Sequence, residues 1–368
     1  MKKILIVGQT PPPWGGQCIM IEKIINMKYD SIKIYHVRMF FSSEFDEVGK
    51  FKFKKVFHIF YIIAMIYYYR FKHNIKVLYY PPAGPNLIPV LRDIIILNSV
   101  RFLFEKTIFH FHAGGVSEYR TQIPSLLRIL FDKAYNGVSV AIRLSHLNPE
   151  DGRKLKAIRE EIIPLGIEDS YLSLKETVKK VKNQDVITIL FVGVVMYQKG
   201  VEDLIRAVGL LQDIKEKIKV RIVGKAESLA FQNKLLQLVN DLNIDRCVEF
   251  CGVKTGNDKW QEYANADIFC FPTFFECETF GVVLLEAMSY KLPVISTYWR
   301  GVPSIVSDEE TGLLVPINDI EKLSYAIRKL VIDEKARSSM GIRGRQRFLE
   351  FYTDEIFSKN MNNLFNSI

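Results

Sequence analysis

Several common signatures are missing from these 368 residues. No Gly-x-Gly-x-x-Gly fingerprint occurs, which disfavours a dinucleotide-dependent dehydrogenase. No Asp-x-Asp pair occurs either, so we expect no essential metal. The five cysteines are an odd number without compact spacing, which indicates neither a disulfide scaffold nor a zinc site, and we interpret them as reduced residues of a cytosolic protein. They are Cys18, Cys247, Cys251, Cys270 and Cys277.

Long hydrophobic runs are also scarce. The longest, residues 56–69, has about 14 apolar positions, whereas a bilayer span needs ~20. Only four apolar residues, 4–7, follow the two lysines near the start, so we expect no signal peptide. Lys52, Lys54 and Lys55 precede the long run and tyrosines end it, a pattern typical of a helix at a membrane interface. The alternative is a buried helix leading into a strand at 76–80, and both can hold at once.

Acidic residues are few in the first half of the chain. Residues 1–165 contain 24 Lys and Arg against 13 Asp and Glu, or +11, and residues 166–368 contain 26 against 28, or −2, which sum to the net +9. The length favours two domains. A basic half favours an anionic partner. No nucleic-acid module is recognisable, so we expect an anionic membrane surface rather than nucleic acid.

Residues 268–316 contain the most informative pattern of the chain. The pattern predicts a strand at 268–271, a polar loop, a helix at 282–289 and a second strand at 293–296. Glu278 lies in the loop and Glu286 on the helix. Between them, the backbone N–H groups of a helix N-terminus favour an anion, here around Thr279, Phe280 and Gly281. A phosphate seat with a carboxylate on either side suits a nucleotide sugar. The alternative is an acidic loop followed by a solvated helix face.

Two loops of the first half have similar potential. A strand at 4–7 leads to Gly15 and Gly16, which precede a helix at 18–26 and either approach a phosphate or form a tight turn. A strand at 107–111 leads to His112, at the sheet edge where ligands bind, although a structural role is the alternative. We expect His110 to point to the other side of that strand, either into the core or behind the residues that contact the ligand.

The second half begins with a strand predicted at 186–192. It is followed by Gly193, by Lys199-Gly200, and by a helix at 201–211. A later strand at 248–251 leads to Gly252, Val253 and Lys254. A lysine in such a loop is ordinarily solvated, so a role for Lys199 depends on its surroundings.

The Glu-x7-Glu spacing, followed by Ala-Met, Pro-Val-Ile-Ser and Thr-Gly-Leu-Leu-Val, resembles the retaining GT-B glycosyltransferases of family 4, the sucrose-synthase-like group 1. The resemblance implies that Glu278 faces the donor sugar and Glu286 holds the ribose hydroxyls. It implies catalytic roles for His112, Lys199 and Glu278. The implied donor-binding residues are Gly15, Gly16, Gly193, Lys199, Val253, Lys254, Glu278, Thr279, Phe280, Gly281 and Glu286.

The chain departs from the family pattern at three positions. Val194 stands where an arginine usually contacts the diphosphate, Leu165 replaces an asparagine at the interdomain crossing, and Ser304 replaces a glutamate. The first departure leaves Lys199 as the main cation at the leaving group, unless another arginine such as Arg300 compensates.

These observations predict an α/β chain of GT-B architecture, with two doubly wound Rossmann-like domains facing a cleft. We expect residues 1–165, with the final helix 352–368, to bind the acceptor, and residues 172–351 to bind the nucleotide sugar. The predicted activity is metal-independent, retaining transfer of a hexose-type sugar to a lipid-linked or saccharide acceptor in cell-surface polysaccharide synthesis. The donor is a substrate, so no cofactor is expected, and the location is the cytoplasmic face of the membrane. A nucleotide-sugar epimerase on this fold and a weakly active sugar-nucleotide-binding subunit remain alternatives.

Overall fold

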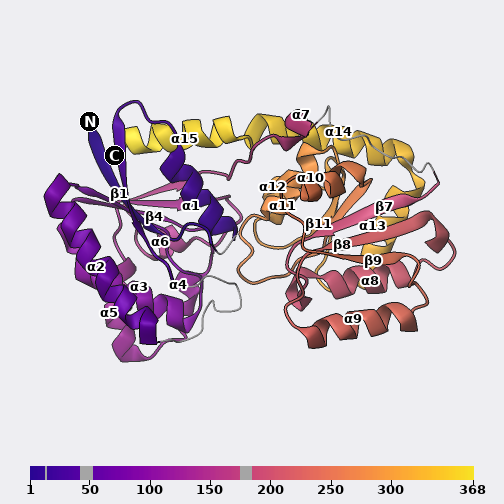
Figure 1. Cartoon of the computed structure of the whole chain (residues 1–368), viewed down its shortest axis with the longest axis horizontal. Helices are drawn as coiled ribbons and strands as arrows, with labels where there is room; N and C mark the ends of the chain where they lie inside the picture. The colour runs from indigo at the N-terminus through magenta and orange to yellow at the C-terminus, as the bar shows by residue number, and fades with distance from the viewer. Residues whose placement is uncertain (13–14, 42–52, 175–184) are drawn as a thin grey trace. The chain divides into compact units, whose positions relative to one another are not determined.

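The computed structural model of the chain describes residues 1–12, 15–41, 53–174 and 185–368 (Figure 1). The contacts divide it into two compact units, Met1–Leu165 with Glu355–Ile368, and Gly166–Asp354. Lys52, the first of the three lysines before the long apolar run, lies outside the described residues.

The first unit is built on a six-stranded sheet of order β2-β1-β3-β4-β5-β6, in which all neighbouring strands are parallel. Its strands are β1 (Lys2–Gly8), β2 (Ile32–Arg38), β3 (Val77–Tyr80), β4 (Lys106–His110), β5 (Val140–Arg143) and β6 (Arg159–Ile162). β3 is buried throughout and β4 at every position after Lys106, as apolar runs of a parallel sheet covered on both faces require. The strand order reverses between β1 and β3, so ligands are expected beside the carboxyl ends of these strands.

Helices cover both faces of this sheet, and α2, α3 and α5 lie side by side on one of them (Figure 1). The longer helices are α1 (Gly16–Asn26), α2 (Phe53–His73), α3 (Leu87–Val100), α5 (Ser125–Tyr135) and α15 (Asp354–Ser367). Phe365 of α15 is fully buried, and its carbonyl accepts a hydrogen bond of 2.9 Å from Lys2 Nζ. The end of the chain therefore completes the unit that its beginning starts.

The second unit has a parallel six-stranded sheet of order β12-β11-β10-β7-β8-β9. Its strands are β7 (Ile187–Val192), β8 (Ile218–Val223), β9 (Val248–Gly252), β10 (Ile268–Phe271), β11 (Val294–Thr297) and β12 (Gly312–Val315). Three consecutive strands run outward on each side of a reversal between β7 and β10. This is the Rossmann strand order, whose ligands bind at the reversal.

The helices of the second unit alternate with its strands, as parallel strands require. They are α7 (Ser170–Leu174), α8 (Val201–Gly209), α9 (Leu229–Asp241), α10 (Gly256–Asn265), α11 (Val282–Ser289), α12 (Val302–Ile305), α13 (Ile320–Ile332) and α14 (Glu334–Phe351). Arg345 of α14 forms an ion pair with Asp169, at 2.5 Å, and bonds to the Ser289 carbonyl at 2.9 Å. It thereby fixes α14 to the end of α11.

The prediction of two doubly wound α/β domains is confirmed for the fold of each unit. The strands expected at 186–192 and 268–271 and the helix expected at 282–289 are present within one residue of their predicted bounds. Within the described residues, no helix combines the length and apolarity needed to cross a bilayer.

Candidate functional site

The strand reversal of the second unit brings two loops together at the carboxyl edge of its sheet. One follows β7 and ends at Gly200; the other follows β10 and begins at Pro272. Gly200 has a left-handed φ of 76°, and a Cβ there would lie 2.1 Å from the Pro272 carbonyl oxygen. Only glycine allows the two loops to approach so closely.

Lys199, the residue before Gly200, reaches across this junction. Its ammonium forms a short ion pair with Oε2 of Glu278, and the two side chains are only 15% and 12% exposed. The ammonium also lies 4.5 Å from the ring centroid of Phe275, within cation–π range. Two residues that sequence reasoning selected separately therefore meet at the sheet reversal.

Beyond Glu278 the chain turns into α11, and that turn presents backbone rather than side chains. Thr279 and Phe280 are buried, and the Phe280 ring packs against Tyr352 at 5.8 Å between centroids. Gly281 is the N-cap with φ 80°, and it has no side chain with which to cap the helix. The Leu284 N–H bonds to the Gly281 carbonyl at 2.9 Å. A helix start whose N-cap residue offers no side-chain acceptor is suited to an anion.

Glu286, on the same helix, is buried and anchored by α10. Lys259 Nζ donates to its Oε1 at 2.7 Å, and the Tyr263 hydroxyl donates to its Oε2 at 2.7 Å. Burial, followed by the adjacent Glu286 charge, raises the pKa of Tyr263 well above its usual value, so the hydroxyl remains a donor. A carboxylate has about four acceptor positions. The two donors therefore orient Glu286 while leaving capacity for ligand hydroxyls.

The loops after β7, β8 and β9 lie against one another at this edge. A Cβ on Gly224 would lie 1.7 Å from the Gly193 carbonyl oxygen, and Gly224 N–H donates to the Gly252 carbonyl at 2.8 Å. Val253 follows with 63% of its surface exposed, next to Lys254. The structure thus places an exposed apolar residue on the same edge as Lys199.

The loop after β11 is the fourth segment of this edge. The Trp299 indole donates to the Phe275 carbonyl at 2.8 Å, which fixes this loop to the one that carries Glu278. Arg300 follows with a left-handed φ of 43°, which costs roughly 1–2 kcal/mol for a residue with a Cβ. Its guanidinium lies 5.5 Å from the Trp299 ring centroid.

In the first unit, His112 lies just beyond β4 and is buried. The prediction that His110 points to the other side is wrong, because residues two apart on an extended chain share a face. The two imidazole centroids are 4.0 Å apart, and His110 Nδ1 lies 2.6 Å from the Tyr79 hydroxyl. Burial lowers the pKa of His112 to about 3 and that of His110 well below its usual value. Both rings are therefore neutral at physiological pH.

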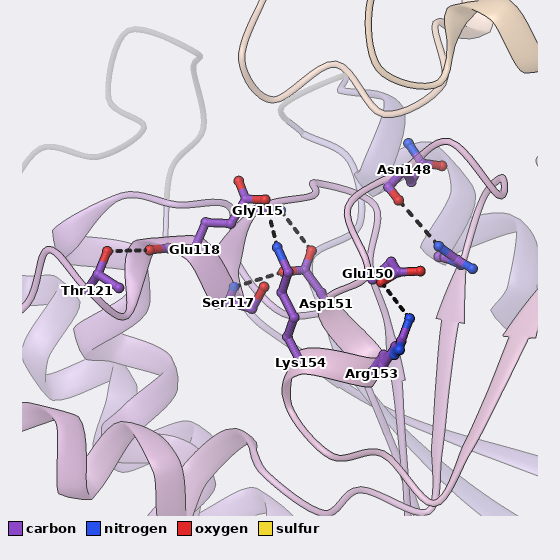
Figure 2. Close-up of polar contacts among 10 residues, drawn as sticks. Gly115, Ser117, Glu118, Thr121, Asn148, Glu150, Asp151, Arg153 and Lys154 are labelled. Carbon is purple, nitrogen blue, oxygen red and sulfur yellow. Dashed lines mark hydrogen bonds and ion pairs between the residues drawn. The ribbon is translucent and has the colours of Figure 1, made fainter.

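The loop after His112 is held by Asp151, as Figure 2 shows. The Asp151 carboxylate accepts the Gly115 N–H at 2.7 Å and the Ser117 N–H at 2.8 Å, at the start of α4 (Val116–Tyr119). Burial raises the pKa of this carboxyl, and the Ser117 and Gly115 hydrogen bonds oppose the rise. The Asp151 carboxylate therefore occupies the start of α4. At the start of α11 the N-cap residue is a glycine and offers no such carboxylate.

The glycine pair of the first unit is less constrained. Gly15 is the N-cap of α1, with no side-chain cap, and its carbonyl accepts the Ile19 N–H at 3.0 Å. A Cβ on Gly16 would have no heavy atom within 4 Å. Contacts among the described residues therefore do not require glycine at position 16.

Comparison with known proteins then shows what the second unit is similar to. Residues 174–347, a little under half of the chain, match the sequence model of the family described as glycosyl transferases group 1. The matched segment contains Lys199, Glu278 and Glu286.

Curated relatives match parts of the chain. The capsular polysaccharide biosynthesis glycosyltransferase CapM of Staphylococcus aureus is 28% identical over 196 residues, which are 53% of this chain and 49% of CapM. D-inositol 3-phosphate glycosyltransferase of Corynebacterium jeikeium is 34% identical over 155 residues, 41% of this chain and 36% of that protein. The matched region is thus about half or less of each of these two relatives.

Solved structures match the chain over its full length. Sucrose-phosphate synthase of Thermosynechococcus elongatus has a TM-score of 0.75 at 19% identity and covers 100% of this chain and 99% of its own. HepE of Anabaena, solved with UDP and glucose, has a TM-score of 0.71 at 15% identity and full coverage of both chains. The fold of the chain is GT-B, as the sequence predicted.

The structure also identifies residues of the second unit that sequence reasoning missed. Lys259 is 27 residues before Glu286 on another helix, so no local spacing indicates their contact. Tyr263, on the same helix as Lys259, is the other residue that bonds to Glu286. For a metal, no suitable group of three or more His, Cys, Asp and Glu exists in the part of the chain that the structure describes.

Proposed function

We propose that this protein is a retaining glycosyltransferase that transfers a sugar from a nucleoside diphosphate sugar to a saccharide or lipid-linked acceptor. The observation that carries the proposal is the Lys199–Glu278 pair beside the N-terminus of α11, whose N-cap is a glycine, with Glu286 about one turn along that helix. A cation and open N–H groups suit a diphosphate, and two oriented carboxylates suit hydroxyl groups.

In this proposal the second unit binds the donor. The N–H groups of α11 and the Lys199 ammonium stabilise the charge that develops on the departing diphosphate, which is electrostatic preorganisation. Glu286 accepts the ribose hydroxyls, Glu278 faces the sugar, and the base rests against Val253 and Lys254. Supporting this placement, Lys199, Glu278 and the start of α11 follow the two strands at the reversal of the sheet, and Val253 and Lys254 follow β9 at the same carboxyl edge.

No carboxylate is required as a nucleophile. A phosphate oxygen of the leaving group deprotonates the acceptor hydroxyl on the face where the new bond forms, which gives retention. The absence of an Asp-x-Asp pair from the sequence supports a metal-independent route. His112 contributes as a neutral hydrogen-bonding ring, because its pKa of about 3 leaves no imidazolium at pH 7.

For the acceptor, we propose an intermediate of cell-surface polysaccharide synthesis, bound by the first unit at the inner face of the membrane. CapM is a capsular polysaccharide enzyme, and WcaL of Salmonella typhimurium, 24% identical over 318 residues, is a putative colanic acid enzyme. The membrane contact is supported by the charge of +11 in residues 1–165 and by the exposed rings of Phe57, Phe60 and Phe71 on α2.

The test is a panel of UDP-, GDP-, ADP- and dTDP-sugars, first by thermal shift and then by release of free nucleotide with a candidate acceptor. We expect one donor to raise the melting temperature and to be consumed only when an acceptor is present. Donor binding without turnover would favour a binding subunit. A new nucleotide sugar formed without an acceptor would favour the epimerase.

A further inference from the structure

The diphosphate proposed above brings at least two negative charges to the carboxyl edge of the second unit's sheet. This edge lacks the arginine that the family pattern has at position 194. Val194, where the family has an arginine, is an apolar side chain with 39% of its surface exposed. Lys199 is already paired with Glu278, so its charge is largely compensated. The loops after β7 and β10 therefore supply less net positive charge than a diphosphate requires.

The loop after β11 supplies a cation without a carboxylate. Among the described residues Arg300 forms no ion pair, and its buried Nε has no hydrogen-bond partner. An unpaired buried donor is costly and uncommon, and it suits a group that awaits a ligand. The Trp299 indole, by its 2.8 Å bond to the Phe275 carbonyl, holds Arg300 beside the loop that carries Glu278.

Contacts of two loops converge on the turn that contains Cys277 and Glu278. The Trp299 indole bonds to the Phe275 carbonyl, which brings the residue before Arg300 to this turn, and Lys199 forms an ion pair with Glu278. Burial raises the pKa of the Cys277 thiol; the charges of Arg300 and Lys199 lower it, and those of Glu276 and Glu278 raise it. The turn leads into the start of α11.

We propose that Arg300 is the second diphosphate-binding cation of this protein and replaces the arginine missing at position 194. This inference rests on the proposed function. A guanidinium presents a planar fork that bonds two phosphate oxygens at once, which an ammonium cannot do. The loop after β11, as well as the loop after β7, then contributes a cation that binds the diphosphate of the donor.

The test exploits the backbone at position 300. Because φ is 43°, glycine fits there without strain, so Arg300→Gly removes the side chain and keeps the loop conformation. Lys291→Gly is the matched control, because it also removes a cation at a left-handed position, with φ 60°. Lys291 lies between α11 and β11, at the end of β11 opposite to Arg300. Calorimetry with UDP, GDP, ADP, dTDP and the matching monophosphates first finds the nucleotide that the wild type binds.

We expect Arg300→Gly to weaken diphosphate binding about 10- to 100-fold and monophosphate binding less than about threefold, with Lys291→Gly unchanged. Arg300→Lys should recover only part of the loss. Val194→Arg in the Arg300→Gly background should restore diphosphate binding, because it returns a guanidinium to the family's position. A role that is only structural would weaken both nucleotides equally and would not be rescued.

The outcomes separate this inference from the function beneath it. If the wild type binds none of the four diphosphates, the proposed function fails. If it binds one and Arg300→Gly binds it equally well, or loses mono- and diphosphate alike, only the assignment of Arg300 is overturned.

Discussion

The histidine pair of the first unit makes acid destabilisation a quantitative prediction. His112 has a pKa of about 3 in the folded chain because it is buried, against 6.5 in an unfolded one. Between these values the unfolded chain binds a proton that the folded chain does not. Stability is therefore complete above pH 6.5 and decreases as the pH falls toward 3.

The magnitude follows from these two values. A pH of 5 is 1.5 units below the pKa of the imidazole in the unfolded chain. At 1.36 kcal/mol per unit, protonation of the unfolded chain therefore lowers the free energy of unfolding by ~2 kcal/mol relative to pH 8. Burial and the neighbouring His112 also lower the pKa of His110 well below its usual value, so His110 destabilises the folded state at acid pH in the same direction.

The measurement uses histidine labelled with carbon-13 and nuclear magnetic resonance between pH 8 and pH 4.5. His112→Asn assigns the signal, and the chain in urea provides the unfolded titration. We expect the His112 ring to remain neutral throughout, and urea unfolding of His112→Asn to lose ~2 kcal/mol less stability than the wild type between pH 8 and 5. A His112 signal that titrates above pH 5 in the folded protein would refute the reasoning.

Three further predictions test the donor edge and the membrane contact. Gly200→Ala should lower the free energy of unfolding of the second unit by several kcal/mol, because the new Cβ would overlap a carbonyl oxygen. Gly252→Ala is the control, because Gly252 has φ 66° and open space around it, and it should lower that free energy by only about 1 kcal/mol. Denaturant unfolding compares the two variants. Glu286→Ala should weaken donor binding roughly ten- to a hundredfold with the fold intact, and unchanged calorimetry would contradict its ribose role. Replacing the three lysines within 52–55 by glutamate should release the protein from anionic vesicles, at ~1 kcal/mol per lysine and less in high salt, while nucleotide binding persists. Equal flotation of the wild type with neutral vesicles would argue against the membrane contact.

The sequence predicted best those elements whose pattern is local. The runs 186–192 and 268–271 are continuous and apolar, and turn residues bound them, so their strands were identified without tertiary information. By contrast, α3 (Leu87–Val100) was not predicted. It is apolar on most sides, so its pattern lacks the 3.6-residue period that distinguishes a helix from a buried strand. Edge strand β2 (Ile32–Arg38) is half-exposed and was missed as well.

The site was predictable residue by residue but not contact by contact. Lys199 and Glu278 are 79 positions apart, and only the strand order of the sheet makes them neighbours. The same is true of Asp151, which bonds to Gly115 across 36 positions and carries no local motif. Chemical type and position after a strand can be read from sequence, whereas partners and burial require the packed chain.

The return of α15 to the first unit has a consequence for how the protein is made. The last 14 residues belong to the unit formed by the first 165, and Phe365 is buried there. A ribosome must therefore synthesise the 189 intervening residues, at ~5–20 residues per second, before the first unit can close. For roughly 10–40 seconds the apolar surface that α15 later covers remains exposed. The second unit, which is continuous in the chain, can complete its fold first.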